Sequence, residues 1–291
     1  MDASNGKITF IGHATLLIQL GNSCFLTDPN FSGRIWPLHQ RQRRPGIGPE
    51  TLPLPDTILV SHANYDHLDI FSYKYFPTRI PILVPKGLGK LIRKFLPNPV
   101  TELLPGGTHQ EGNCKIHAVP TLKRGKRWVP IRYTQSTAYL LESPFGCIYF
   151  PGNTGYGPHF KETGSRFRID VACLPIQPQP GQATGPKSSL NPAKALQACE
   201  DLGARWLIPI RWDAFRFGKS RGEDLISELR DLAKKNNLEN RLKILEPGQS
   251  MTFSKEERQS PVSKTPAPYR TRSSDTAKPS LKPVDGSKGQ C

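Results

Sequence analysis

The sequence contains no long apolar run and no paired cysteines, and both absences narrow the possible classes of protein. No stretch approaches the ~20 apolar residues of a membrane-spanning helix, and residues 1–7 carry no signal or transit peptide pattern. The six cysteines form no C-x-x-C pair, and several lie in apolar stretches. We therefore expect reduced, buried thiols and a cytoplasmic protein without a transmembrane segment.

Acidic residues are also scarce. Lys and Arg number 40 against 24 Asp and Glu, which gives a formal net charge of +16. Such an excess points to an anionic partner: a phosphate-bearing small molecule, a phospholipid headgroup, a nucleic acid or an acidic protein. The alternative is that the charge serves solubility, since the sequence contains no recognised nucleic-acid-binding motif.

Large apolar residues become sparse at the C-terminal end of the sequence. The apolar fraction of the whole chain is 36%, which is low for a compact enzyme. Residues 254–291 are rich in Ser, Thr, Pro and Lys, and they cannot bury enough surface to offset the entropy of ordering. We predict one domain over residues 1–253, followed by a disordered basic tail over residues 254–291.

Apolar patterns and turn signals predict strands early in this domain and helices later. The predicted strands cover residues 7–20, 24–27, 57–60, 80–85, 113–119, 136–142, 147–150, 171–175, 206–210 and 251–253, and the predicted helices cover 86–96, 191–202 and 223–235. Residues 31–53 are rich in Pro, Gly and Arg and are predicted to form an irregular loop. Consecutive strands followed by helices favour an α/β (α+β) fold, an αββα four-layer sandwich, over a βα repeat.

One loop carries most of the chemical information. Residues 61–69 read SHANYDHLD and come directly after the apolar strand predicted at 57–60. His62, Asp66 and His67 fit the pattern H-x-H-x-D-H of a binuclear metal-binding loop, but Asn64 stands at the second histidine. Whether the metals are retained depends on the ligand positions elsewhere in the chain.

Short segments in a fixed order resemble the metallo-β-lactamase superfamily. They are GHAT at 12–15, LTDP at 26–29, the loop at 61–69, GNTGY at 152–156, NP at 191–192, IRW at 210–212 and EPG at 246–248. They are most similar to the branch that contains N-acylphosphatidylethanolamine phospholipase D and the L-ascorbate-6-phosphate lactonases. The resemblance implies an αββα fold and two metal ions, which activate a water for attack on an ester, amide, lactone or phosphodiester.

The resemblance assigns metal ligands to seven positions, of which three are retained as His62, Asp66 and His67. The replaced positions are Asn64 for the second loop histidine, Lys123 at or beside the third histidine, Asn153 for the bridging aspartate and Arg211 for the last histidine. A further histidine of the phospholipase branch corresponds to Ser189. The resemblance also implies that His13, Asp28, Ser189 and Trp212 support the site from behind its ligands.

The replacements change the charge of the site. Asn153 cannot supply the charge of a bridging carboxylate, and an arginine cannot be deprotonated in a protein. A guanidinium a few ångströms from a divalent ion costs several kcal/mol even at an effective dielectric constant of about 20. Without metal, Asp66 faces two cations, Lys123 and Arg211. We therefore predict that Arg211 pairs with Asp66.

Three states of the His62, Asp66 and His67 cluster are open. It binds two metals, or a single weakly held zinc or other divalent ion with Asp66 as the catalytic residue, or no cofactor. We favour the state without a cofactor, in which Asp66 is a structural hydrogen-bond centre. The positions Asn64, Lys123, Asn153 and Arg211 then form either an internal salt bridge or a cationic pocket for a phosphate or carboxylate.

The leading hypothesis for function is a catalytically degenerate, phospholipase-D-like pseudoenzyme that serves as a binding or scaffolding module for an anionic ligand. One alternative is a divergent hydrolase of a phosphodiester, phospholipid or phosphorylated lactone, using one metal at His62, Asp66 and His67. A second alternative is a basic protein associated with nucleic acid.

Two further segments bear on partners. Residues 123–128, KRGKRW, combine four cations with a tryptophan, so they form either a solvated loop or a surface for single-stranded nucleic acid or lipid headgroups. Residues 35–38, IWPL, lie beside an arginine-rich loop and offer a small apolar surface. They allow peripheral attachment to a membrane.

Overall fold

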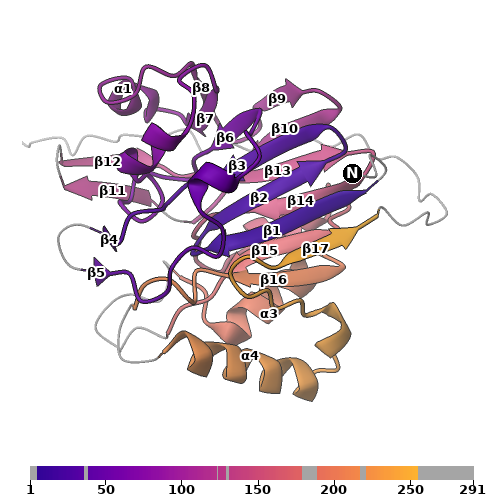
Figure 1. The fold of residues 1–291 in the computed structure, drawn as a ribbon. Helices are drawn as coiled ribbons and strands as arrows, with labels where there is room; N and C mark the ends of the chain where they lie inside the picture. The colour runs from indigo at the N-terminus through magenta and orange to yellow at the C-terminus, as the bar shows by residue number, and fades with distance from the viewer. Residues whose placement is uncertain are drawn as a thin grey trace, which may run out of the picture.

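Two β-sheets lie face to face in the computed structural model, which describes residues 5–35, 39–122, 124–128, 131–178, 189–216 and 221–254 (Figure 1). For residues 124–128 and 131–134 it describes the backbone alone. The predicted tail therefore lies outside the described residues except for Ser254. Lys123 and the apolar segment at 36–38 also lie outside them.

The first sheet has seven strands in the order β17-β1-β2-β3-β6-β7-β8. Their bounds are β17 Ser250–Phe253, β1 Gly6–Gly12, β2 Thr15–Leu20, β3 Ser23–Thr27, β6 Thr57–Leu59, β7 Ile82–Pro85 and β8 Val100–Leu103. Pairing is antiparallel from β17 to β3 and parallel from β3 to β8. Strands β1, β3 and β6 therefore end at the same edge.

The second sheet has six strands in the order β16-β15-β14-β13-β10-β9. Their bounds are β16 Trp206–Ile210, β15 Val171–Pro175, β14 Gly146–Phe150, β13 Ala138–Ser143, β10 Cys114–Val119 and β9 Thr108–Glu111. Strands β14, β15 and β16 run parallel, and the remaining pairs are antiparallel.

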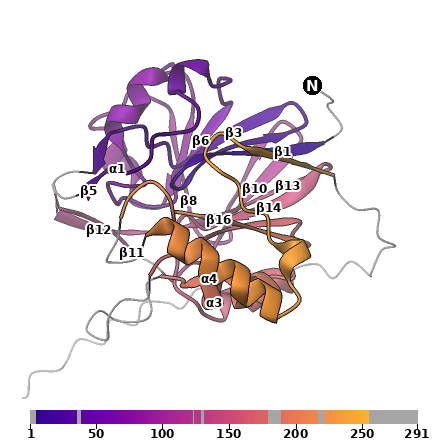
Figure 2. The ribbon, with the colours of Figure 1, turned by 60° about the horizontal axis from the view of Figure 1, so that its bottom comes forward.

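Helices cover the outer faces of both sheets. Helices α3 (Pro192–Asp201) and α4 (Gly222–Lys235) lie below the second sheet in Figures 1 and 2. The first sheet is covered by α1 (Gly89–Ile92) and the 3-10 turn η2 (Ile70–Tyr75). Within the described residues no helix is both long and apolar enough to cross a bilayer.

Shorter elements complete the chain. They are the strand pairs β4 (Arg34–Ile35) with β5 (His39–Gln40) and β11 (Arg124–Trp128) with β12 (Ile131–Gln135), helix α2 (His159–Gly164), and the 3-10 turns η1 (Pro49–Thr51) and η3 (Glu239–Arg241). Two small antiparallel pairs thus stand apart from the main sheets.

The buried side chains explain why the strands are apolar on both faces. In β2, Leu16 and Ile18 face the core between the sheets, whereas Leu17 belongs to the cluster beneath α1 and η2. In the same way, Leu59 of β6 faces inward and Ile58 outward. Because each strand is covered on both sides, its sequence is continuously apolar. The architecture is the αββα sandwich that the strand order predicts.

The structure corrects several predicted elements. Residues 7–20 are two strands, because the chain reverses at His13, whose φ is +58°. The helix predicted at 86–96 is regular only over α1, since it begins after the turn at Gly87 and ends in i→i+3 hydrogen bonds before Pro97. Strands β8 and β9 were not predicted. Residues 124–128 are a hairpin strand rather than a loop.

Candidate functional site

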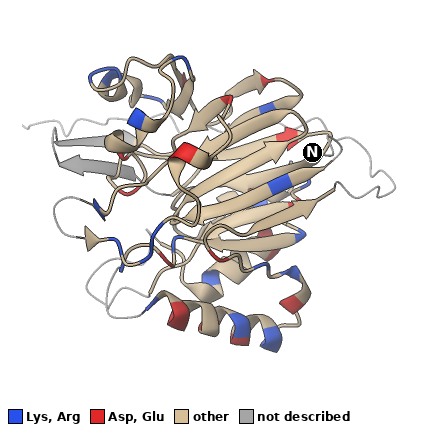
Figure 3. Cartoon of the chain, in the orientation of Figure 1, with Lys and Arg blue, Asp and Glu red and all other residues tan. Residues whose placement is uncertain are grey.

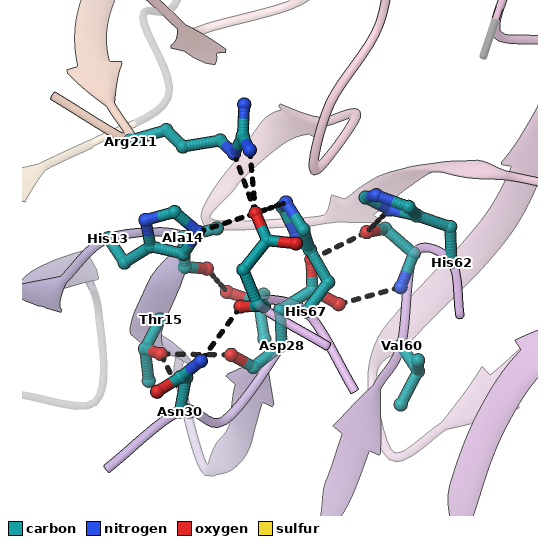
Figure 4. Close-up of polar contacts among 12 residues, drawn as sticks. His13, Ala14, Thr15, Asp28, Asn30, Val60, His62, His67 and Arg211 are labelled. Carbon is teal, nitrogen blue, oxygen red and sulfur yellow. Dashed lines mark hydrogen bonds and ion pairs between the residues drawn. The ribbon is translucent and has the colours of Figure 1, made fainter. Parts of the chain in front are cut away.

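Five loops converge at the edge where the two sheets meet. Each follows the carboxyl end of a strand and carries one polar group of the site: His13 after β1, Asp28 after β3, the loop at 61–69 after β6, Asn153 after β14 and Arg211 after β16. Figure 4 shows His13, Asp28, His62, His67 and Arg211 directed toward one another. The chain folds this way because short apolar strands end abruptly at polar residues.

Asp66 is the centre of the cluster. Its Oδ2 atom accepts hydrogen bonds from Arg211 Nη2 at 2.6 Å and Nε at 3.2 Å, so one edge of the guanidinium faces a single oxygen. His13 Nε2 donates to the same oxygen at 3.1 Å, and His67 Nε2 lies 3.3 Å from it. The side chains of Asp66 and Arg211 are only 8% and 4% exposed, so the ion pair is buried. The predicted pairing of Arg211 with Asp66 is present.

A second chain of hydrogen bonds continues from His67 to His62. Asp28 Oδ2 lies 2.6 Å from His67 Nδ1 and accepts from Ser61 Oγ at 2.5 Å, while Asp28 Oδ1 accepts from the Ser61 N–H at 2.7 Å. Ser61 Oγ in turn lies 2.8 Å from His62 Nδ1. Metal-binding histidines are typically held in this way, with the second ring nitrogen bonded to a carboxylate or another polar group.

The charges of the cluster balance one another. Burial alone would raise the pKa of Asp66, but the charges of His67 and Arg211 and the hydrogen bond from His13 hold that pKa well below its usual range. Burial opposes protonation of His67, yet Asp66 and Asp28 on either side raise its pKa. The structure thus favours an imidazolium at His67. With Arg211 it balances the carboxyls of Asp66 and Asp28, although burial raises the pKa of Asp28 against the charge of His67.

His13 is neutral in this arrangement. Burial lowers its pKa to about 3, against the hydrogen bond to Asp66. Because the neighbouring oxygen of Asp66 is a charged acceptor, the neutral imidazole donates through Nε2–H. His13 therefore stabilises the carboxylate without adding charge.

The backbone on both sides of the cluster is strained. His13 and Arg211 have φ values of +58° and +69°, and the Arg211 N–H donates to the His13 carbonyl at 2.7 Å. Left-handed conformations at residues other than glycine cost of order 1–3 kcal/mol each and are common at functional sites. This hydrogen bond joins the end of β1 in the first sheet to the end of β16 in the second sheet.

Gly152 holds the Asn153 loop against the cluster. Its φ is +63°, and a Cβ atom there would lie 1.9 Å from Ser61 Oγ and 2.9 Å from Asp28 Oδ2. Asn153 itself is fully buried, and its side-chain amide forms no hydrogen bond within the described residues. A buried amide thus occupies the position where the resemblance places a bridging aspartate.

The remaining predicted site residues take different places. Asn64 is half-buried and contributes its carbonyl, which accepts from the N–H groups of His67 and Leu68. Trp212 is buried, donates through Nε1 to the Pro209 carbonyl and stacks on a core phenylalanine, Phe10. Ser189 is half-buried before α3 and joins none of the hydrogen bonds of the cluster. Lys123 lies outside the described residues.

Sequence reasoning missed several contributors. Ser61 links Asp28 to His62, and Asn30 Nδ2 donates to the Asp66 carbonyl at 3.0 Å. Asp213, which the sequence suggested as a partner for Arg211 or another cation, accepts the His13 N–H at 2.9 Å and lies in the field of Arg41 and Arg43. The only sequence signal for these residues is their position beside recognised motifs, because their partners are distant in the chain.

The fold and the loop at 61–69 define a class, the αββα proteins with a metal-binding motif at the end of an inner strand. The chain belongs to the metallo-β-lactamase superfamily: the family described as "Beta-lactamase superfamily domain" matches residues 24–212.

Named relatives support the same family. The chain is 30% identical over 227 residues to an uncharacterized protein of Mycobacterium tuberculosis, covering 74% of this chain and 60% of that protein. It is 29% identical over 248 residues to the N-acyl-phosphatidylethanolamine-hydrolyzing phospholipase D 1 of Caenorhabditis elegans, covering 77% of this chain and 69% of that protein. The chain thus spans only about 60% of the length of the mycobacterial relative.

A solved structure agrees on the fold. The isothiocyanate hydrolase from Delia radicum gut bacteria matches with a TM-score of 0.69 at 18% sequence identity, covering 85% of this chain and 99% of that one. At this identity the likeness concerns the fold alone.

The described residues do not fit a pair of metal ions. Two groups bring three candidate ligand atoms within 4.8 Å of one another: His13, Asp66 and His67 in one, Asp28, His62 and His67 in the other. His67 is shared by both groups, and Arg211 already binds the Asp66 oxygen that a metal would use. A single ion would fit the group with Asp66 only after Arg211 moves away and His67 loses a proton, and it would fit the group with Asp28 only after His67 loses a proton.

Proposed function

We propose that this domain is a binding module in which a metal-free, salt-bridged cluster replaces the hydrolytic metal centre of its superfamily. The observation that carries the proposal is the buried bond of 2.6 Å between Arg211 and Asp66. A guanidinium cannot release its proton to become a ligand, so it competes with a metal rather than helping to bind it. No cofactor is required in this proposal.

The energetics favour the ion pair over a metal. Removing one partner of a buried ion pair typically costs about 3–5 kcal/mol, because the other charge is left without compensation. A metal at Asp66 would displace Arg211 and a proton from His67, and it would gain no carboxylate at Asn153. The free energy of metal binding would have to offset the loss of the ion pair and of the His67 proton, with only a few ligands to supply it.

The ligand of the module is proposed to be a small anion. Arg211 and His67 are cationic donors whose charges already balance Asp66 and Asp28, so the net positive charge for an anion comes from Lys123 in the sequence. The buried amide of Asn153 forms no hydrogen bond within the described residues, so it offers a donor to a bound oxygen. A phosphate or carboxylate group matches this set of donors.

One observation favours a second candidate, a hydrolase that uses a single metal. The ligand atoms of His13, Asp66 and His67 lie within 4.8 Å of one another. Asp66 would be the catalytic ligand, and the substrate a phosphodiester, phospholipid or phosphorylated lactone. The name of the Caenorhabditis elegans relative, a hydrolysing phospholipase, supports this candidate. No observation on the described residues favours the nucleic-acid alternative.

Metal analysis separates the two candidates. The purified full chain is dialysed against metal-free buffer and analysed by plasma mass spectrometry. We expect less than about 0.1 metal ions per chain, since buried ion pairs persist unless a partner is removed. Stoichiometric zinc, iron or manganese after dialysis would overturn the binding-module proposal.

Restoring the family ligands provides the matched experiment. The variant Asn64→His, Lys123→His, Asn153→Asp, Arg211→His is expected to retain one to two zinc ions after the same dialysis. Its control adds Asp66→Asn, which removes a retained ligand and should abolish the gain. If the fourfold variant folds and gains no metal, the ligand positions have been assigned wrongly.

A further inference from the structure

The outer layer of the first sheet is formed by a segment that contains no acidic residue. Residues 70–101, which run from η2 through α1 into β8, include six Lys or Arg and no Asp or Glu. All six are exposed: Lys74, Arg79, Lys86, Lys90, Arg93 and Lys94. In Figure 3, α1 carries basic residues alone, whereas α4, in the outer layer of the second sheet, carries acids and bases. The first sheet therefore has a cationic outer layer.

The two acids that border this segment are already bonded. Asp69 is buried, and its Oδ2 atom accepts from Ser72 Oγ at 2.6 Å. Glu102 accepts from the Gly89 N–H at 2.9 Å, at the start of α1, and lies near Arg93. Within the described residues, none of the six cations forms an ion pair. The lysine charges are therefore not balanced by a neighbouring carboxylate.

Exposed aromatic rings lie among these cations. Six large apolar side chains are exposed within the described residues, and three of them belong to this segment: Phe71 at 75%, Tyr75 at 37% and Phe95 at 51%. Because residues three apart in a 3-10 helix lie on one face, Phe71 and Lys74 project from the same side of η2. Lys74 Nζ also lies 4.9 Å from the centre of the Tyr75 ring. The outer side of η2 thus combines apolar rings with a cation.

A buried asparagine holds the chain after α1 against the chain after η2. Asn98, three residues beyond Phe95, donates through Nδ2 to the Ile80 carbonyl at 2.9 Å and to the Pro77 carbonyl at 3.5 Å. Pro77 in turn lies two residues beyond Tyr75. The buried side chains of η2 and α1 also belong to one apolar cluster. The exposed rings of the two elements therefore lie on adjoining parts of one surface.

We propose that this surface binds a membrane that contains anionic lipids. We call it the cationic face and define it by Phe71, Lys74, Tyr75, Lys90, Lys94 and Phe95. A lysine near an anionic bilayer strengthens binding about fivefold. Phenylalanine rings among lysines are typical of segments that lie at the boundary between headgroups and acyl chains, because the ring leaves water while the ammonium group stays in it.

A single-stranded nucleic acid would be attracted by the same charges, but it needs rings placed along a groove on which successive bases stack. The rings of the cationic face instead stand on the outside of two separate elements, which suits the broad surface of a bilayer. Binding at this face is independent of whether the cluster around Asp66 holds a metal.

Co-sedimentation with vesicles measures this binding on the full chain. The probes are vesicles of phosphatidylcholine alone and vesicles in which about one third of the lipid is phosphatidylserine. We expect at least about tenfold tighter binding to the anionic vesicles, and its loss at about 1 M salt, where the Debye length falls to about 3 Å. Equal binding to both kinds of vesicle, or binding to neither, would overturn the proposal.

Matched charge variants separate the cationic face from the rest of a basic chain. The variant of the face is Lys74→Gln, Lys90→Gln, Lys94→Gln, and the control, which removes the same charge from α4, is Arg230→Gln, Lys234→Gln, Lys235→Gln. The first should weaken binding to anionic vesicles roughly a hundredfold, as three lysines at about fivefold each predict. The control should change the affinity less than about threefold. Equal losses in both would show that overall charge, not this face, binds the lipid.

The apolar part of the face has its own test. Phe71→Ala removes a ring that is 75% exposed, so the variant should fold and should bind anionic vesicles about tenfold more weakly. Leu122→Ala, which removes another exposed apolar side chain at the end of β10, is the control and should bind as the parent does. Unchanged binding in Phe71→Ala would refute insertion of the ring. A chain that binds a single-stranded oligonucleotide more tightly than the anionic vesicles would identify a nucleic-acid surface and would also overturn the proposal.

Discussion

Arg211 and a divalent ion would compete for the same oxygen of Asp66. Two nitrogen atoms of the guanidinium lie 2.6 and 3.2 Å from that oxygen. The side chains of Arg211 and Asp66 are both buried. At the scale of single residues, Arg211 therefore acts as a permanent counter-charge of Asp66, at a position where the resemblance implies a histidine ligand. The stability of the fold then depends on the arginine.

Replacing Arg211 by methionine tests this dependence. We expect Arg211→Met to lower the free energy of unfolding by about 3 kcal/mol, because Asp66 would keep its charge with His67 as the remaining cation. Urea denaturation followed by circular dichroism measures the change. Arg221→Met, at an exposed position, is the control and should stay within about 0.5 kcal/mol of the parent. A variant as stable as the parent would show that Arg211 is not the main counter-charge of Asp66.

His67 makes the stability depend on pH. Its pKa is raised above 6.5 in the folded chain, so the stability it contributes is complete below pH 6.5 and is lost as pH rises toward the folded pKa. The free energy of unfolding should fall by about 1.4 kcal/mol per pH unit in that interval. Buried His13, whose pKa is lowered, acts in the opposite direction and only below pH 6.5.

Urea denaturation between pH 6.5 and 7.5 measures this slope, well below the ordinary thiol pKa of 9.0. In this interval Asp66 stays ionised in both states and adds nothing, whereas burial raises the pKa values of Asp28 and Asp213, which act in the same direction as His67. His67→Gln keeps both carboxyls, so it is the control and should show a smaller slope than the parent. If the free energy of unfolding of the parent protein does not change with pH, His67 is not the group that holds the proton of the cluster.

At the scale of elements, the sequence predicted those strands and helix ends that are determined by residues close together in the chain. The apolar strand β6 delivers the loop with His62, and Asn191 caps α3 through a bond of 2.8 Å to the Lys194 N–H, as its sequence indicates. The reversal at His13 carried one local signal, Gly12, but the left-handed backbone of His13 is held by Arg211 from the other sheet. Contacts between residues about 200 positions apart leave no pattern in a single sequence.

The start of α4 provides a prediction for an element. The helix can pack against the loop after β16 only because residue 222 is glycine, as the Trp212 carbonyl lies 2.0 Å from the position of a Cβ atom. Gly222→Ala should therefore lower the free energy of unfolding by roughly 2 kcal/mol, the usual cost of overpacking. Gly33→Ala, with open space at its Cβ position, should be neutral. Equal effects of the two variants in thermal denaturation would contradict this packing.

At the scale of the whole molecule, the two sheets are joined at two places. The hydrogen bond between Arg211 and His13 joins them at the carboxyl ends of β16 and β1. Along the side formed by β16 and β17, β17 pairs with β1, and Phe253 packs on Trp206 of the second sheet with a ring separation of 6.3 Å. The last described strand therefore completes the first sheet and covers the second. Its loss would expose core on both.

Truncation and substitution at this edge test how far the folded domain extends. A chain that ends after Ser254 keeps every described contact, so its melting temperature should match that of the full chain. Phe253→Ala in that shortened chain should cost about 3–5 kcal/mol, since the ring is 4% exposed and fills the space above Gly6 and Gly146. Met251→Ala, at a half-buried position of the same strand, is the control and should cost less. Calorimetry of the three chains measures the differences. A large loss on truncation after Ser254 would mean that residues 255–291 contribute to the stability of the domain and that its boundary lies beyond β17.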